Sequence, residues 1–168
     1  MVAKDGLRTA DHDAPQAFGC SLPGGGQRVA AAGAVLHLVE PLGFSIEDRY
    51  LKRAGLDYWN LVDVHLYGSL DEFFSKCRGG DFFYITTKAE KSYADAEIPD
   101  GSYLLFGKET KGLPEELLKA NYGRCIRIPM VSDARSLNIS NAAAIVLYDA
   151  LRKLEFPGLK ADGKPGHF

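Results

Sequence analysis

Polar residues that could do chemistry follow two apolar segments in the C-terminal half of the chain. Glu109 comes shortly after the apolar run 103–106, and Ser136 and Asn138 come after the segment 124–130. Ligand crevices in α/β sheets form at the carboxyl ends of strands, so a carboxylate, a hydroxyl and an amide placed there could hold a ligand and polarise a reacting group. The alternative interpretation is that these residues only form turns and cap helices, because strand-end loops without a phosphate-type fingerprint are weak signals.

Two strand–loop–helix units would position these residues. The run 103–106 predicts a buried strand that ends at Gly107, and Pro114 suits the first turn of a following helix because its missing N–H costs nothing there. The segment 124–130 predicts a second short strand, and a polar loop follows it.

The segment 138–154 carries the strongest helical pattern in the chain. Its apolar residues recur with spacings of three and one, at Ile139, Ala142, Ala143, Val146, Leu147, Ala150, Leu151 and Leu154. Further apolar residues off this stripe make the helix apolar nearly all round, which is typical of a helix buried on more than one side. In a chain this short a second subunit could provide the other side, so the pattern favours a homodimer.

The rest of the chain alternates strands with helices. Apolar runs and alternation predict strands at 34–40, 61–67 and 81–87, with helices at 47–54 and 70–77 between them. Such alternation predicts an α/β domain with a mostly parallel sheet flanked by helices.

Length and composition indicate one soluble domain. The chain has 168 residues, of which 46% are hydrophobic and 25% charged, and this is ordinary for a globular domain. No apolar run approaches the roughly 20 residues that span a bilayer, and the N-terminus lacks the apolar core of a signal peptide. Three cysteines without a close pair and four histidines without metal-ligand spacing predict no disulfide framework and no metal site, in keeping with a reducing cytoplasm.

The formal net charge of −2 requires an uneven charge distribution if the partner is a nucleic acid, because phosphate contacts need clustered Lys and Arg. Arg49, Lys52 and Arg53 form one basic cluster, and Arg135 belongs to the basic residues that flank the two strand-end loops. These four residues are the candidates for RNA contacts. A solvated surface without a partner is an equally plain interpretation of any one of them.

Three segments resemble a known family. LLFGKETKGLP at 104–114 and IRIPMVSDARSLNISNAAAIVLYDALR at 126–152 resemble, in order and spacing, two signature motifs of the SpoU branch of the SPOUT methyltransferases. EPLGFSIEDRYLKRAGLDYW at 40–59 resembles the small members that methylate the ribose of nucleotide 34 in certain leucine tRNAs. The resemblance covers 28–158. It implies a C-terminal deep trefoil knot, S-adenosylmethionine as methyl donor, S-adenosylhomocysteine as product, tRNA as partner, and a homodimer.

The resemblance also assigns site residues. It places the adenosyl pocket at three strand-end loops, near Ile85, Gly107 and Ile128, with Ser136 beside them. Gly107 makes physical sense there because glycine lets backbone approach a ligand closely. Glu109, Ser136 and Asn138 match positions that hold substrate or cofactor. Arg28 matches an arginine linked to activation of the ribose hydroxyl, and because a guanidinium stays protonated, stabilising the developing alkoxide is its expected role.

The N-terminal segment departs from the family pattern. Residues 1–27 contain Gly24-Gly25-Gly26 and no apolar run that predicts a strand, so an irregular segment is expected where the family has a strand and an Asn-x-Gly-Asn element. A reading-frame slip and real divergence are both open explanations. The predicted organisation is an irregular segment 1–27, a methyltransferase domain 28–158 and a flexible tail 159–168. The alternative function is a non-catalytic dimer that binds S-adenosylmethionine or RNA and has lost turnover.

Overall fold

The protein is built around a six-stranded sheet. Its structure is a computed structural model that describes residues 17–21, 32–40, 63–108, 111–160 and 162–163. The strand order is β3-β2-β1-β5-β4-β6. The strands are β1 (Ala17–Ser21), β2 (Val35–Val39), β3 (Val64–Tyr67), β4 (Phe82–Ile85), β5 (Tyr103–Gly107) and β6 (Cys125–Ile126). In the described residues the helices are α2 (Leu70–Lys76), α3 (Glu115–Ala120) and α4 (Ile139–Lys153), with 3₁₀ turns η2 (Tyr93–Asp95) and η3 (Tyr122–Arg124).

Five of the six strands run in the same direction. β2 and β3 are parallel, and so are β5, β4 and β6. β1 lies between these two groups and is antiparallel to both β2 and β5. The prediction of a mostly parallel sheet flanked by helices is therefore confirmed, and the carboxyl ends of β4, β5 and β6 meet at one edge.

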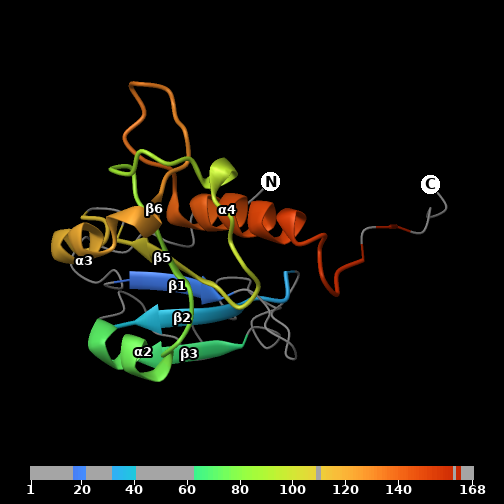
Figure 1. The fold of residues 1–168 in the computed structure, drawn as a ribbon, viewed down its shortest axis with the longest axis horizontal. Coiled ribbons are helices and arrows are strands. Elements are labelled where there is room, and N and C mark those ends of the chain that lie inside the picture. The colour runs from blue at the N-terminus through green and yellow to red at the C-terminus, as the bar shows by residue number, and fades with distance from the viewer. Residues whose placement is uncertain (1–16, 22–31, 41–62, 109–110, 161, 164–168) are drawn as a thin grey trace, which may run out of the picture.

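Both faces of the sheet are covered by helices (Figure 1). Alternate residues of a strand point to opposite faces, and β5 follows this rule: Leu104 and Phe106 belong to the apolar cluster under α4, whereas Leu105 packs with α2 and α3 on the other face. Val146 and Leu151 of α4 are fully buried in the first cluster. The helix predicted at 138–154 is confirmed within one residue at each end.

Local chemistry sets the ends of the helices. Ser69 caps α2 by accepting a hydrogen bond from the Glu72 N–H at 3.1 Å, and the Glu72 carboxylate accepts from the Gly68 N–H at 2.7 Å. The first bond satisfies an N–H of the first helical turn, which has no partner within the helix. Asn138 caps α4 through the Ser140 N–H at 2.9 Å.

Three predictions need correction. The segment expected to be irregular at 1–27 contains β1, and its pairing on both sides outweighs the weak strand propensity of its own sequence. The strand predicted at 124–130 shrinks to Cys125–Ile126, because Arg127 forms only an isolated bridge with Ser92 and Pro129 has no N–H to donate. Leu159, expected in a flexible tail, packs against the cluster under α4. The helix predicted at 47–54 lies outside the described residues.

Candidate functional site

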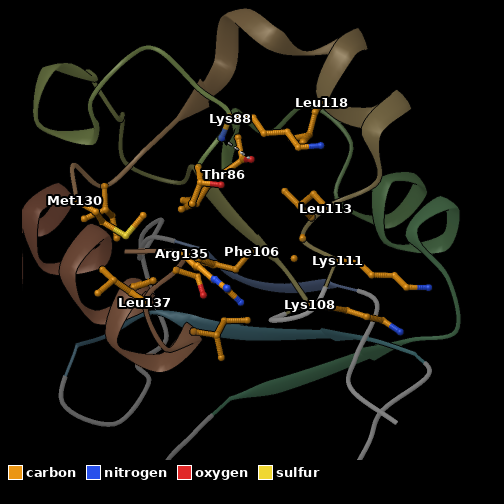
Figure 2. A pocket seen from close by; sticks show the side chains of 18 residues that line it. Thr86, Lys88, Phe106, Lys108, Lys111, Leu113, Leu118, Met130, Arg135 and Leu137 are labelled. Atoms are coloured by element: carbon orange, nitrogen blue, oxygen red, sulfur yellow. Dashed lines mark hydrogen bonds between the residues drawn. The ribbon is translucent and has the colours of Figure 1, made fainter. Parts of the chain in front are cut away.

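A cavity of about 500 Å³ opens where β4 and β5 end and where the chain leaves β6. This size is within the range of small-molecule sites, about 300–1,000 Å³. Figure 2 shows side chains from these three chain segments and from the start of α4 surrounding it. The lining residues are Ile85, Thr86, Thr87, Lys88, Phe106, Gly107, Lys108, Lys111, Gly112, Leu113, Leu118, Ile128, Met130, Arg135, Ser136, Leu137, Ile139 and Ala142.

The cavity combines an apolar lining with a few polar groups. Its apolar part comes mainly from strand ends and from the first turn of α4, with Phe106 buried and Ile128 and Ile139 packed against the core cluster. Hydroxyl groups are contributed by Thr86, Thr87 and Ser136. An apolar surface with a few polar groups can hold a planar apolar ring and orient the polar part of the same ligand.

Gly107 lines this cavity, but the closest approach at Gly107 comes from the chain itself. A Cβ on Gly107 would lie 2.0 Å from the carbonyl carbon of Gly112 and 2.0 Å from the backbone nitrogen of Leu113. The Gly112 N–H donates to the Lys108 carbonyl at 2.8 Å, and Gly112 has φ +68°, a conformation that favours glycine. The backbone of Gly112 and Leu113 therefore lies directly against Gly107.

The other wall of the cavity includes a segment with little packing of its own. All residues from 131 to 138 are exposed, and the Ala134 N–H donates to the Val131 carbonyl at 3.0 Å. This segment is the orange loop at the top of Figure 1. It is held at its two ends, by Ile128 and Ile139, both of which pack against the core cluster.

The structure brings five of the predicted site residues together. Ile85, Gly107, Ile128, Arg135 and Ser136 all line the cavity, although they come from three separate segments of the sequence.

Among the other predicted residues, the structure describes only Asn138, which is not one of the lining residues. Asn138 caps α4 and also accepts a hydrogen bond from the Ser140 hydroxyl. Arg28, Arg49, Lys52, Arg53 and Glu109 lie outside the described residues.

Sequence reasoning missed the polar contribution of β4. Thr86, Thr87 and Lys88 directly follow that strand and line the cavity, and their place at a strand end was the available signal. Lys88 forms an ion pair with Glu115 of α3 at 2.5 Å. The hydrogen bond and charge of Lys88, with the charge of Lys119, hold the pKa of the Glu115 carboxyl below its usual value.

A second polar cluster lies away from the cavity, between β2 and β3. His37 is buried, and its Nδ1 is 2.9 Å from the Tyr67 hydroxyl, which is 3.7 Å from the Cys77 sulfur. Burial and then the neighbouring His65 lower the pKa of His37 to about 4, and Asp63 opposes them only in part. Burial also raises the pKa of Tyr67. This cluster is a buried hydrogen-bonded part of the core.

Among the residues that the structure describes, no group of three His, Cys, Asp or Glu side chains is arranged to hold a metal ion. In the same part of the chain, none of the helices is both long and apolar enough to cross a membrane.

Comparison with known proteins gives consistent matches. The model of the SpoU rRNA methylase family matches residues 25–148. A Geobacillus stearothermophilus protein provisionally named tRNA (cytidine(34)-2'-O)-methyltransferase is 51% identical over 133 residues, which are 77% of this chain and 85% of the relative. The Escherichia coli K12 protein named tRNA (cytidine(34)-2'-O)-methyltransferase is 42% identical over 130 residues, which are 77% of this chain and 83% of the relative.

A solved structure extends the match to a protein with bound ligand. The AdoMet-bound rRNA methyltransferase of Sinorhizobium meliloti has a TM-score of 0.63 and 26% sequence identity, covering 74% of this chain and 48% of that chain.

Proposed function

The chain belongs to the SpoU rRNA methylase family, and from this membership we propose that it transfers a methyl group from S-adenosylmethionine to a tRNA. The acceptor is the ribose 2′-hydroxyl of nucleotide 34, the wobble nucleotide, and leucine tRNAs are the substrates. The names of the Geobacillus and Escherichia coli relatives support the position and the reaction. The same names make the non-catalytic binding dimer the less favoured alternative.

The observation that carries this proposal is the cavity at the carboxyl ends of β4 and β5. Its volume of about 500 Å³ and its mixture of apolar and hydroxyl groups suit a nucleoside with a short polar tail. The adenine ring would lie against the apolar groups near Ile85, Phe106 and Ile128. Ser136 and Thr86 would face the polar part of the donor. The AdoMet-bound Sinorhizobium relative supports this choice of ligand.

The proposed reaction is an in-line displacement. When bound, S-adenosylmethionine supplies an electrophilic methyl carbon on a sulfonium. The 2′-oxygen would form a bond to this carbon while the carbon–sulfur bond broke with its electron pair on sulfur, and the hydroxyl proton would pass to solvent water. The protein must hold donor and hydroxyl in line, which can contribute about 7–11 kcal/mol. We assign Ser136 and Glu109 to positioning, and Arg28 to stabilising negative charge on the 2′-oxygen.

The same proposal includes the assembly and the location. The protein acts as a cytoplasmic homodimer through α4, with the tRNA also contacting Arg49, Lys52, Arg53 and Arg135. The methyltransferase domain comprises 28–158 together with β1, which pairs with β2 and β5 in the middle of its sheet. Its C-terminal part, including the 131–138 segment and α4, forms the deep trefoil knot of the family.

Methyl transfer to defined tRNAs tests the function. Purified protein is incubated with labelled donor and leucine tRNA transcripts, with matched transcripts that carry a 2′-deoxyribose at position 34 alone. Label should enter the ribose transcripts and not the deoxy transcripts. Equal labelling of both would exclude nucleotide 34 as the acceptor, and donor binding without transfer to any tRNA would support the non-catalytic alternative. Transcripts for other amino acids test the restriction to leucine.

A further inference from the structure

The lining of the cavity is strongly biased towards positive charge. Four of its residues are cationic, namely Lys88, Lys108, Lys111 and Arg135, and none of the lining residues in the described part of the chain is acidic. The whole chain has a formal net charge of −2. The cations are therefore concentrated at this site although the chain as a whole has a negative net charge. Such a local concentration of positive charge attracts an anionic ligand.

The four cations are not equivalent. Lys88 forms an ion pair with Glu115, whereas Lys108, Lys111 and Arg135 form no ion pair with any other residue that the structure describes. Elsewhere in the described chain some cations, such as Lys76, Lys119 and Arg124, pair with carboxylates, and others, such as Arg78 and Lys91, do not. The charge at the cavity that is available to a ligand thus comes from Lys108, Lys111 and Arg135.

The methyl donor is a poor match for this charge. S-adenosylmethionine carries a sulfonium, an ammonium and a carboxylate, so its own net charge is positive. Like charges close together repel each other, and these cations would weaken donor binding unless they faced another molecule. A polyanion that enters beside the donor fits them better.

The loop after β5 presents its two lysines outward. The Gly112 N–H bonded to the Lys108 carbonyl closes the loop over Gly107. In Figure 2, Lys108 and Lys111 extend in the same direction, away from the cavity. Lys111 is exposed, and the loop hydrogen bond uses only backbone atoms, so the two side chains are not needed to hold the loop.

We propose that Lys108 and Lys111, together with Arg135, bind backbone phosphates of the RNA substrate next to the reacting ribose. The proposal rests on the proposed function and names two phosphate-binding residues for it. In this arrangement the RNA covers the mouth of the cavity on the side of the β5 loop, while Lys88 remains paired with Glu115.

The salt dependence of tRNA binding tests this directly. A plot of log affinity against log salt concentration has a slope of about −0.7 for each phosphate contact to a single strand and about −0.9 for each contact to a duplex. The double variant Lys108→Gln/Lys111→Gln should therefore bind leucine tRNA with a slope shallower by roughly 1.4–1.8. Lys119→Gln is the matched control, because it removes one exposed, Glu116-paired lysine of α3 and should leave the slope unchanged. The double variant Lys108→Arg/Lys111→Arg should retain the parent slope.

Donor binding separates this proposal from its competitors. Affinities for S-adenosylhomocysteine and for methylthioadenosine, which lacks the amino-acid tail, are measured by calorimetry. For each of the two ligands, the affinity of the glutamine double variant should equal that of the parent. A lower affinity of the variant for S-adenosylhomocysteine alone would show that the lysines hold the donor carboxylate, and it would overturn the proposal.

The failure of the proposal differs from the failure of the proposed function. If the parent methylates tRNA and the glutamine double variant keeps the full slope, the phosphate assignment is wrong and the function stands. If the parent neither binds nor methylates tRNA, both are wrong.

Discussion

The backbone of Gly112 lies where a side chain of residue 107 would be, with its carbonyl carbon 2.0 Å from the position of a Cβ on Gly107. Sequence reasoning explained Gly107 by close approach of a ligand to the backbone. The structure gives a different reason, since the loop after β5 occupies that space. Glycine at 107 is therefore required by the fold before any ligand binds.

Gly107→Ala should consequently destabilise the protein without donor. A methyl group forced against backbone atoms has no flexible neighbour to move aside, and overpacking costs about 1–3 kcal/mol, occasionally more. Urea unfolding of the donor-free protein measures the loss. Gly123→Ala is the control, because nothing lies within 4 Å of its Cβ position. Unchanged stability of Gly107→Ala would mean that Gly112 and Leu113 do not pack against residue 107 in solution.

Asn138 and Ser136 should respond differently to alanine. The Asn138 side chain accepts hydrogen bonds from the Ser140 N–H and hydroxyl, so Asn138→Ala should lower the free energy of unfolding by about 1 kcal/mol. Ser136 is exposed and lines the cavity. Ser136→Ala should leave stability unchanged and reduce methyl transfer, by up to about 10²–10³-fold if the hydroxyl is a positioned donor.

Asn138→Ser distinguishes a cap from a catalytic contact. Serine is also a good N-cap residue, so this variant should keep the stability of α4. If its transfer rate equals that of the parent, Asn138 acts as a cap. A large loss of rate with full stability would instead place Asn138 in contact with substrate.

Acid should destabilise the protein through His37. The pKa of His37 is about 4 when folded, against 6.5 as the ordinary value. Between these values the unfolded chain binds the proton more readily, so the free energy of unfolding falls as pH drops from about 6.5 to about 4. The expected loss is about 3 kcal/mol.

Comparison with His37→Asn isolates this contribution from that of the carboxylates. Asparagine can still reach the Tyr67 hydroxyl and does not titrate. The free energy of unfolding of the parent should therefore fall relative to that of the variant as pH drops from about 6.5 to about 4, and the difference should be constant outside this range. Urea unfolding at a series of pH values measures it. Parallel curves for parent and variant would show that His37 is accessible to protons in the folded state.

An interface on α4 would explain its exposed apolar residues. Ile145 is 37% exposed and Tyr148 is 44% exposed, and the homodimer predicted from the sequence would cover them. Tyr148→Glu should then yield particles of the chain mass, 18.3 kDa, where the parent gives twice that mass in light scattering. Leu66→Glu, on the distant strand β3, serves as the control. A parent that is already monomeric at micromolar concentration would contradict the prediction.

The sequence predicted the elements that carry strong local patterns. β5 is four consecutive apolar residues followed by Gly107, and α4 has an apolar stripe that only a helix can bury on one side. β1 has no such pattern, because its strand conformation depends on pairing with β5, about 90 residues later in the chain. That pairing cannot be read from the five residues themselves.

The candidate site was predictable where it depends on strand ends. Ile85, Gly107 and Ile128 follow from that rule and from the family resemblance, and all three line the cavity. The Lys88–Glu115 ion pair joins residues 27 positions apart, and the contact between Gly107 and Gly112 depends on how the loop closes. Both are products of the three-dimensional arrangement, so the sequence indicated neither.

Because α4 completes the core, the fold can close only after residue 153 has been synthesised. Val146, Ala150 and Leu151 are fully buried in the cluster that includes Leu104 and Phe106. The Lys153 ammonium at the end of α4 donates to the Tyr93 and Ala96 carbonyls at 2.9 and 3.0 Å. At about 5–20 residues per second, the ribosome needs roughly 2–9 s to travel from the end of β5 to the end of α4. Hydrophobic collapse takes less than a millisecond, so the nascent sheet waits with one apolar face uncovered, and the cell must keep that face from joining another chain.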